Sequence, residues 1–165
     1  KDQDLPSFIH GGSQERGKRA GTENIAGIVG MAEALSIAAH EMPYTRNRLI
    51  RLRNYFVERV RHEIPQSRLN GHPYKRLPGN VNFSFAGIDA TALLVLLEEE
   101  EICASAGSAC NTGQTRISHV IEAIRVPEDY AAGSVRFTMG RDTTKRDVDA
   151  CVDALKRSVT ILRQE

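Results

Sequence analysis

The segment Asn80–Phe85 alternates residue by residue between polar and apolar side chains. Because successive side chains of a strand point to opposite faces, this pattern predicts a half-buried β-strand whose phenylalanines face a core and whose asparagines face away from it. A second segment, Ser134–Met139, alternates in the same way. Strands of this kind need an apolar layer on one face, so the chain must supply helices that pack on a small sheet.

Apolar residues at helical spacing predict these helices over residues 25–41, 44–63, 89–100 and 118–124, and from Thr144 toward the end of the chain. Pro43 is expected to separate the first two, Asp89 to cap the third, and Thr144 to cap the last with Asp147 in capping-box position. A third, short strand is predicted at Ile102–Ser105 and a loop over residues 66–79. The predicted fold class is α/β, as a small α+β domain with a sheet covered by helices.

Composition excludes several classes of protein. The 165 residues carry a net charge of +1, with 41% hydrophobic residues, as in ordinary globular domains. The near-neutral charge argues against direct nucleic-acid binding and against a membrane-surface role. No apolar run is expected to reach the roughly 20 residues of a membrane span. The three cysteines cannot all pair, which favours a reducing, cytoplasmic setting.

The cysteines differ in their surroundings. Cys110 lies in a run of small residues, 104–113, which predicts a loop that exposes its thiol. An exposed thiol on such a loop suits a nucleophile. Cys103 lies in a predicted strand and Cys151 lies beside the apolar stripe of the last helix, so both are predicted to be structural. Neither these cysteines nor the scattered histidines have the spacing of a zinc site.

The glycine-rich segment before the first helix allows two interpretations. Gly12–Arg19 has the G-x-x-x-x-G-K spacing of a nucleotide-binding loop, but Arg19 stands where that loop needs serine or threonine. Alternatively, Gly21-Thr22 lies directly before a helix start, where free N–H groups and the helix dipole favour an anion, and the Thr22 hydroxyl can donate to a phosphate. Thr22 or Asn24 can also serve simply as the N-cap.

Arg136 lies in the second alternating segment. An arginine in a half-buried strand is costly unless it is paired, and its planar fork suits a carboxylate bound at two points. The alternative is that Arg136 faces solvent on the polar side of the strand.

Three blocks of sequence resemble those of the NifS/IscS-type cysteine desulfurases. They are His10–Asn24 (HGGSQERGKRAGTEN), Ser105–Cys110 (SAGSAC), and Val135–Arg141 (VRFTMGR), which Thr143-Thr144 follows. The blocks occur in the family's order and together span nearly the whole chain.

The resemblance implies a fold-type I aminotransferase scaffold with pyridoxal 5′-phosphate (PLP) and a small, mostly antiparallel sheet in the C-terminal domain. It also implies an activity that converts L-cysteine to L-alanine and leaves a persulfide on Cys110. Arg136 then binds the substrate carboxylate, and Thr22 donates to the cofactor phosphate across a homodimer. The implied sulfur acceptors serve iron–sulfur cluster assembly, thiolated tRNA or DNA sulfur modification.

In that family the Schiff-base lysine lies upstream of the His-Gly-Gly block in a Ser-x-His-Lys setting. This chain has no such setting, since Ser118-His119 is followed by Val120. We therefore expect residues 1–41 to be the end of a large PLP domain with its linking helix and residues 42–165 to be a small C-terminal domain, inactive without the remaining part. The alternative is a stand-alone persulfide carrier or interaction module that uses no cofactor.

Overall fold

The structure, a computed structural model, describes residues 6–106 and 117–164. The chain divides into two compact units, Lys1–Met42 and Pro43–Glu165. Their elements follow in the order η1 (Gln14–Gly17), α1 (Ile25–Glu63), β1 (Ser67–Leu69), β2 (Asn80–Phe85), α2 (Ala90–Glu99), β3 (Ser105–Ala106), α3 (His119–Ala123), α4 (Glu128–Ala131), β4 (Ser134–Thr138) and α5 (Lys145–Leu162). The division lies one residue after the predicted boundary, and the assignment of each part to a domain of a longer enzyme stays a prediction.

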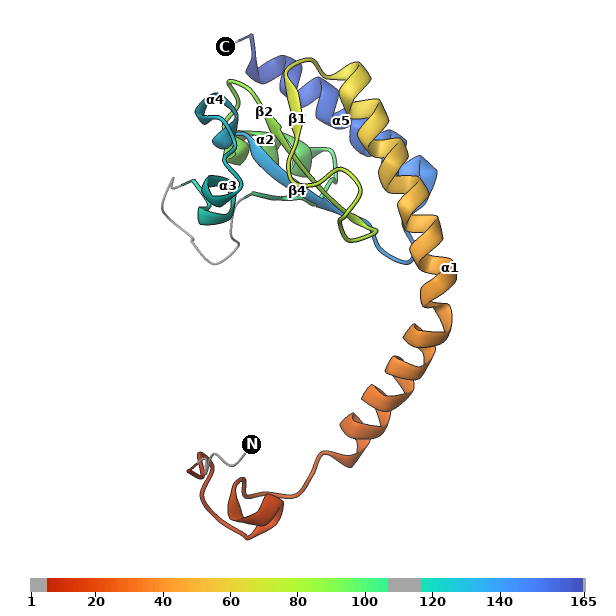
Figure 1. Cartoon of the computed structure of the whole chain (residues 1–165), viewed down its shortest axis with the longest axis vertical. Coiled ribbons are helices and arrows are strands. Elements are labelled where there is room, and N and C mark those ends of the chain that lie inside the picture. The colour runs from red at the N-terminus through yellow and green to blue at the C-terminus, as the bar shows by residue number, and fades with distance from the viewer. Residues whose placement is uncertain (1–5, 107–116, 165) are drawn as a thin grey trace. The chain divides into compact units, whose positions relative to one another are not determined.

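The second unit is built on one antiparallel sheet in the order β1-β2-β4-β3 (Figure 1). Strands β2 and β4 lie at its centre and are the two segments predicted from alternation. Val135 and Phe137 are paired with Phe83 and Val81 in register and face the core. The predicted α+β fold with a small sheet covered by helices is therefore confirmed.

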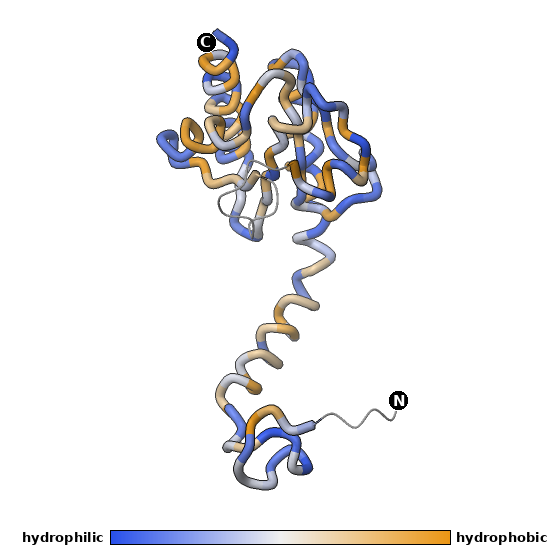
Figure 2. The backbone as a smooth tube through the Cα atoms, turned by 90° about the vertical axis from the view of Figure 1, so that its left-hand side faces the viewer, coloured by the Kyte–Doolittle hydropathy of each residue, from blue (hydrophilic) through white to orange (hydrophobic). Residues whose placement is uncertain are grey.

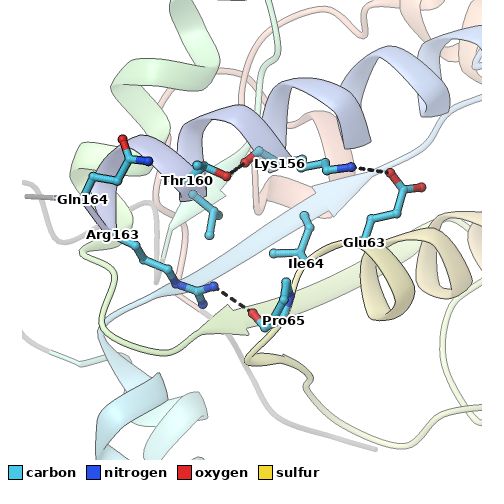
Figure 3. Close-up of a pocket in the computed structure, with 8 residues that line it drawn as sticks. Glu63, Ile64, Pro65, Lys156, Thr160, Arg163 and Gln164 are labelled. Atoms are coloured by element: carbon cyan, nitrogen blue, oxygen red, sulfur yellow. Dashed lines mark hydrogen bonds and ion pairs between the residues drawn. The ribbon is translucent and has the colours of Figure 1, made fainter.

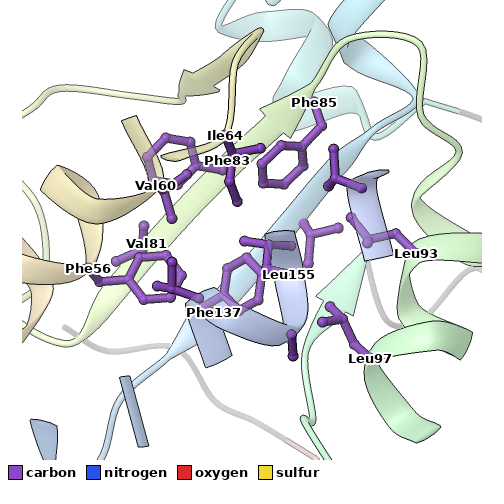
Figure 4. Close-up of a cluster of buried hydrophobic side chains, with 14 of the residues drawn as sticks. Phe56, Val60, Ile64, Val81, Phe83, Phe85, Leu93, Leu97, Phe137 and Leu155 are labelled. Atoms are coloured by element: carbon purple, nitrogen blue, oxygen red, sulfur yellow. The ribbon is translucent and has the colours of Figure 1, made fainter. Parts of the chain in front are cut away.

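The core lies between this sheet and helices α2, α5 and the second part of α1 (Figure 4). Phe56 from α1 packs against Phe137 at a ring-centroid distance of 5.1 Å and against Phe83 at 6.3 Å. Leu93 and Leu97 of α2 and Leu155 of α5 are fully buried beside them. Burial of large apolar side chains from α1, α2, α5, β2 and β4 holds the sheet and the helices together.

The helix ends follow the predicted caps. The Asp89 carboxylate accepts from the backbone N–H groups of Thr91 and Ala92, and Thr144 and Asp147 form the reciprocal capping box of α5. Asn24 caps α1, since its Oδ1 accepts from the Gly27 N–H at 3.0 Å. These side chains satisfy N–H groups that the first turn of a helix leaves free.

Two predicted boundaries are wrong. The helix does not end at Pro43, because α1 continues through it to Glu63. A proline's φ is already helical, although it removes one backbone hydrogen bond and its ring crowds the preceding turn. Before Pro43 the helix is rich in good helix formers such as alanine, glutamate and methionine. The short strand begins at Ser105 rather than at Ile102, because residues 100–102 fold back on the end of α2: the Ile102 N–H donates to Leu97 O at 2.9 Å and Glu101 adopts φ 60°.

The first part of α1 exposes much of its apolar surface. Ile25, Val29, Met31 and Leu35 are each more than 60% exposed, and Figure 2 shows hydrophobic residues along this part of the helix. By length and composition alone, α1 is long and apolar enough to cross a membrane, although no uninterrupted apolar run reaches that length; core helices of other proteins also pass this test.

A charged network joins α1 to α5, which lie side by side in Figure 1. Asp149 accepts from Tyr55 Oη at 2.6 Å, from Lys145 Nζ at 2.8 Å and from Arg59 Nη1 at 3.0 Å. Arg59 also pairs with Glu63 at 2.6 Å and with Asp153 at 2.8 Å. The hydrogen bonds from Lys145 and Tyr55 lower the pKa of Asp149 from 3.8 to about 2.

This lowered pKa predicts acid sensitivity of the α1–α5 contact. The folded pKa lies below the unfolded one, so the contribution of Asp149 to stability is complete above about pH 4 and is lost as the pH falls toward 2. We expect Asp149→Asn to flatten the fall in unfolding free energy over this window, measured by urea unfolding at a series of pH values. Asp142→Asn, at an exposed position outside the network, is the matched control. An equally steep fall in the Asp149→Asn variant would contradict the role of this carboxylate.

Candidate functional site

Arg136 lies in the middle of β4, with its side chain exposed on the face of the sheet opposite the helical core. We call this side the outer face; it carries Asn82, Ser84, Ser134, Arg136 and Thr138. In register, Arg136 is paired with Asn82 on β2 and with Ser105 on β3. Within residues 6–106 and 117–164 no acceptor or carboxylate binds its guanidinium. Of the two interpretations of Arg136, the structure supports an exposed arginine, and its fork is available to a ligand.

Cys110 itself lies outside the described residues, so its predicted exposure stays a prediction. Its sequence position is nevertheless tied to Arg136, because residues 107–116 follow directly after β3. Ser105, which is paired with Arg136 in register, is five residues before Cys110. The strand next to Arg136 therefore leads into the segment that carries the predicted nucleophile.

The other two cysteines occupy different environments. Cys151 is partly buried and packs against the core, and burial raises the pKa of its thiol to about 12. A thiol with so high a pKa carries almost no thiolate near neutral pH and is a poor nucleophile, which agrees with a packing role. Cys103 is exposed. The prediction that Cys103 lies within a strand is wrong, because β3 begins only at Ser105.

Thr22 lies in the first unit, three residues before α1 begins. Because Asn24 provides the N-cap, the Thr22 hydroxyl is not needed for that purpose. It is exposed and makes no hydrogen bond to the part of the chain that the structure describes. Arg19 lies close by, and its Nη1 donates to Gly21 O at 2.8 Å and to Thr22 O at 3.4 Å. A hydroxyl donor next to a guanidinium fits a phosphate group such as that of PLP.

The nucleotide-loop interpretation of Gly12–Arg19 is not supported. A nucleotide-binding loop of this type leads directly into a helix whose N-terminus holds the phosphates. Here the segment contains η1, with Glu15 and Arg16 in left-handed conformation, and the next helix begins only at Ile25. The lysine of the motif therefore does not stand at a helix start.

Sequence reasoning missed a polar network on the outer face. Asn70 Nδ2 donates to Asn82 Oδ1 at 2.6 Å and to Ser84 Oγ at 2.7 Å, and Ser134 Oγ donates to Asn82 Oδ1 at 3.1 Å. Asn70 and Ser134 are 4% exposed and Ser84 is 0% exposed. Alternation assigns Asn82, Ser84 and Ser134 to the polar face, and Asn70 lies in the predicted loop over residues 66–79. Neither pattern gives a sign that these side chains bind one another.

A cavity of about 300 Å³ lies between the ends of α1 and α5 (Figure 3). Arg163 reaches across its rim to Pro65 O at 2.9 Å, and Lys156 pairs with Glu63 at 3.5 Å. Its lining consists of Glu63, Ile64, Pro65, Lys156, Val159, Thr160, Arg163 and Gln164. No residue predicted to act on a substrate lines this cavity, so we do not assign it to the functional site.

Comparison with protein families matches residues 7–151 to the model of class-V aminotransferases. The chain is 46% identical over 163 residues to the cysteine desulfurase IscS of Dictyoglomus turgidum, a match that covers 99% of this chain and 41% of that protein. It is 42% identical over 159 residues to the cysteine desulfurase IscS of Methanosarcina thermophila, covering 96% and 39%. The chain thus spans about two fifths of the length of the curated relatives it matches.

Comparison with solved structures also finds NifS-like proteins. A NifS-like protein of Rickettsia africae superimposes with a TM-score of 0.78 at 25% identity, covering 94% of this chain and 40% of that one. A further structure described as a NifS-like protein gives a TM-score of 0.81 at 28% identity, covering 98% and 40%. The matched region is the C-terminal portion of these structures.

Proposed function

Since the chain belongs to the class-V aminotransferase family, we propose that it works as the C-terminal part of a PLP-dependent cysteine desulfurase. The substrate is L-cysteine, and the products are L-alanine and a persulfide on Cys110. Support comes from identities of 46% and 42% to cysteine desulfurases over nearly the whole chain. The proposal concerns the enzyme that contains these residues together with a PLP-binding lysine. This sequence lacks the Ser-x-His-Lys motif in which the family carries that lysine.

The observation that carries the proposal is the position of Arg136. An exposed guanidinium on β4 lies beside β3, and β3 leads into the segment with Cys110. A guanidinium can hold the carboxylate of an amino acid at two points. A thiol on the adjoining segment can then meet the side chain of the same amino acid. Desulfuration of cysteine needs such a carboxylate-binding group together with a nucleophile, for which we propose Cys110.

PLP, when bound, withdraws electrons from the amino acid and so makes cleavage of its carbon–sulfur bond feasible. In this chain Thr22 and Arg19 are the residues proposed to hold its phosphate, with the Thr22 hydroxyl as donor. In the family this threonine acts across a dimer, so we also propose a homodimer. The Thr22 contact then comes from the partner subunit.

Cys110 is proposed to act as the nucleophile in its thiolate form. Its sulfur attacks the sulfur of L-cysteine, so that an S–S bond forms as the carbon–sulfur bond of the substrate breaks. The electron pair stays with the substrate carbon, which takes up a proton and leaves as L-alanine. The persulfide then passes to an acceptor protein. We propose iron–sulfur cluster assembly, thiolated tRNA or DNA sulfur modification as the destination, in the cytoplasm.

The direct test is product analysis of the PLP-loaded enzyme with L-cysteine and a reductant. We expect L-alanine and sulfide in equal amounts, with no products when PLP is removed. Formation of pyruvate and ammonia in place of L-alanine would assign the enzyme to a different reaction. Transfer of a persulfide from an external persulfide donor to Cys110 of the 165-residue chain, together with no products from L-cysteine in the PLP-loaded enzyme, would favour the cofactor-free carrier instead.

Replacing Arg136 by lysine tests the carboxylate contact. Lysine keeps the positive charge and loses the planar fork, so one charge-assisted hydrogen bond of about 1.5–3 kcal/mol is lost. We expect KM for L-cysteine to rise roughly 10- to 100-fold, since each 1.4 kcal/mol is a factor of ten, with a smaller effect on kcat. Arg68→Lys, on the exposed side of β1, is the control. An unchanged KM in the Arg136→Lys enzyme would remove this residue from the substrate site.

A further inference from the structure

The outer face holds a polar arrangement whose purpose the desulfurase proposal does not explain. Asn82 is paired in register with Arg136, so the two side chains emerge next to each other from adjacent strands. Directly opposed residues of an antiparallel pair have Cβ atoms about 4.5–5.5 Å apart. One small ligand over this residue pair can therefore be reached by both the Arg136 guanidinium and the Asn82 amide.

The orientation of the Asn82 amide is set by hydrogen bonds from neighbouring side chains. Asn82 Oδ1 accepts two hydrogen bonds, from Asn70 Nδ2 at 2.6 Å and from Ser134 Oγ at 3.1 Å. Asn70 is further held by Ser84 Oγ at 2.7 Å. Asn70, Ser84 and Ser134 are all at least nine-tenths buried. Buried polar groups are costly unless they are hydrogen-bonded, and these bonds hold the Asn82 oxygen in place, while Asn70 Oδ1 is buried without a hydrogen-bond partner among the described residues.

Fixing the oxygen of an amide also fixes its nitrogen, because both belong to one planar group. Asn82 Nδ2 has two N–H donors and no acceptor for them among residues 6–106 and 117–164. Arg136 beside it offers five more donors, also without an acceptor in these residues. The free donors of Asn82 Nδ2 and Arg136 suit a ligand that only accepts, and a carboxylate is such a ligand.

We propose that Asn82 is a second donor to the substrate's α-carboxylate, that its Nδ2 binds the carboxylate oxygen beside the Arg136 fork, and that Asn70 and Ser134 are positioning residues that keep the amide turned this way. The proposal rests on the proposed role of Arg136 and adds a residue to that site. On this proposal, the polar side chains of the outer face serve to bind the carboxylate of an amino acid as well as to stabilise the sheet.

The test uses Asn82→Asp in the PLP-loaded enzyme. Aspartate keeps an oxygen for Asn70 and Ser134 but replaces the donating nitrogen by a second, charged oxygen that repels a carboxylate. Dissociation constants are measured from the cofactor absorbance with two probes, L-alanine and cysteamine, which has no carboxylate. We expect L-alanine to bind at least tenfold more weakly, because a hydrogen bond to a charged group is lost, and cysteamine to bind as before. Thr138→Val, on the same face of β4, is the matched control.

Equal loss of affinity for both probes, or an unchanged affinity for L-alanine, would overturn the proposal. If Asn82→Asp does not fold, Ser134→Ala takes its place, because it removes one of the two anchors and keeps the Nδ2 donor. We expect a smaller loss of L-alanine affinity there, again with cysteamine unchanged, and an unchanged L-alanine affinity would overturn the positioning role. Binding of L-alanine is measured independently of desulfuration, so the two proposals can fail separately. If the unsubstituted enzyme binds L-alanine but does not turn over L-cysteine, the desulfurase proposal is rejected. If it turns over L-cysteine and both variants bind L-alanine as tightly as it does, only the role of Asn82 is rejected.

Discussion

Cys110→Ser in the PLP-loaded enzyme is expected to abolish release of sulfide from L-cysteine. A hydroxyl is a far weaker nucleophile than a thiolate near neutral pH, and it cannot form the S–S bond that receives the sulfur. Binding of L-cysteine is expected to persist, because the carboxylate contact proposed for Arg136 is untouched. We therefore expect kcat to fall by several orders of magnitude while substrate binding is retained. The rate of sulfide formation measures kcat, and titration with L-cysteine measures binding.

Cys103→Ser is the matched control for this experiment. Cys103 is exposed and lies seven positions earlier in the chain, before β3, whereas Cys110 comes after β3. If exposure alone made a thiol reactive here, both serine variants would lose activity. We expect the Cys103→Ser enzyme to keep its kcat. Full activity of the Cys110→Ser enzyme would reject Cys110 as the nucleophile.

Phe137→Ala is expected to lower the free energy of unfolding of the chain by about 3–5 kcal/mol, the usual cost of removing a buried phenylalanine. Phe137 is 4% exposed at the centre of the core, and its ring packs against Phe56. Truncation removes the packing of this ring against Phe56 of α1 and leaves a cavity that the surrounding core closes only in part. Since β4 also carries Arg136, the substrate site depends on the same packing.

Urea unfolding at equilibrium measures this effect as a lower midpoint with an unchanged m-value. Thr138→Ala, at the neighbouring exposed position of β4, is expected to change the unfolding free energy by no more than about 0.5 kcal/mol. A loss below about 1 kcal/mol in the Phe137→Ala chain would place this residue outside the core.

Local pattern is enough to predict the central part of the fold. Asn80–Phe85 is a strand with the predicted bounds, because a six-residue alternation leaves one register that buries all three apolar side chains. Thr144 and Asp147 start α5 for an equally local reason, since a capping box is complete within four residues. Such features do not depend on the rest of the molecule.

Elements that depend on distant partners were missed or misplaced. Strand β1 has only three residues and no alternation to reveal it, and it forms because β2 offers an edge to pair with. The start of β3 is displaced because the end of α2 uses residues 100–102 for its own hydrogen bonds.

Some residues of the candidate site can be predicted from sequence, and others only from the structure. Motif resemblance identifies Thr22, Cys110 and Arg136, and the structure adds that Arg136 is exposed beside β3. Asn82 could not be identified from sequence, because its partners Asn70 and Ser134 come from other parts of the chain. The alternation shows which face a residue occupies, whereas hydrogen bonds across that face depend on strand order and register.

The central claim is that Cys110 accepts sulfur from L-cysteine, and mass spectrometry tests it most directly. The PLP-loaded enzyme is treated with L-cysteine without reductant, alkylated and digested with trypsin, which leaves Cys103 and Cys110 on one peptide because no lysine or arginine lies between Arg76 and Arg116. Fragmentation of that peptide is predicted to place one additional sulfur atom on Cys110 and none on Cys103. An unmodified Cys110, or the added sulfur on Cys103, would contradict the account.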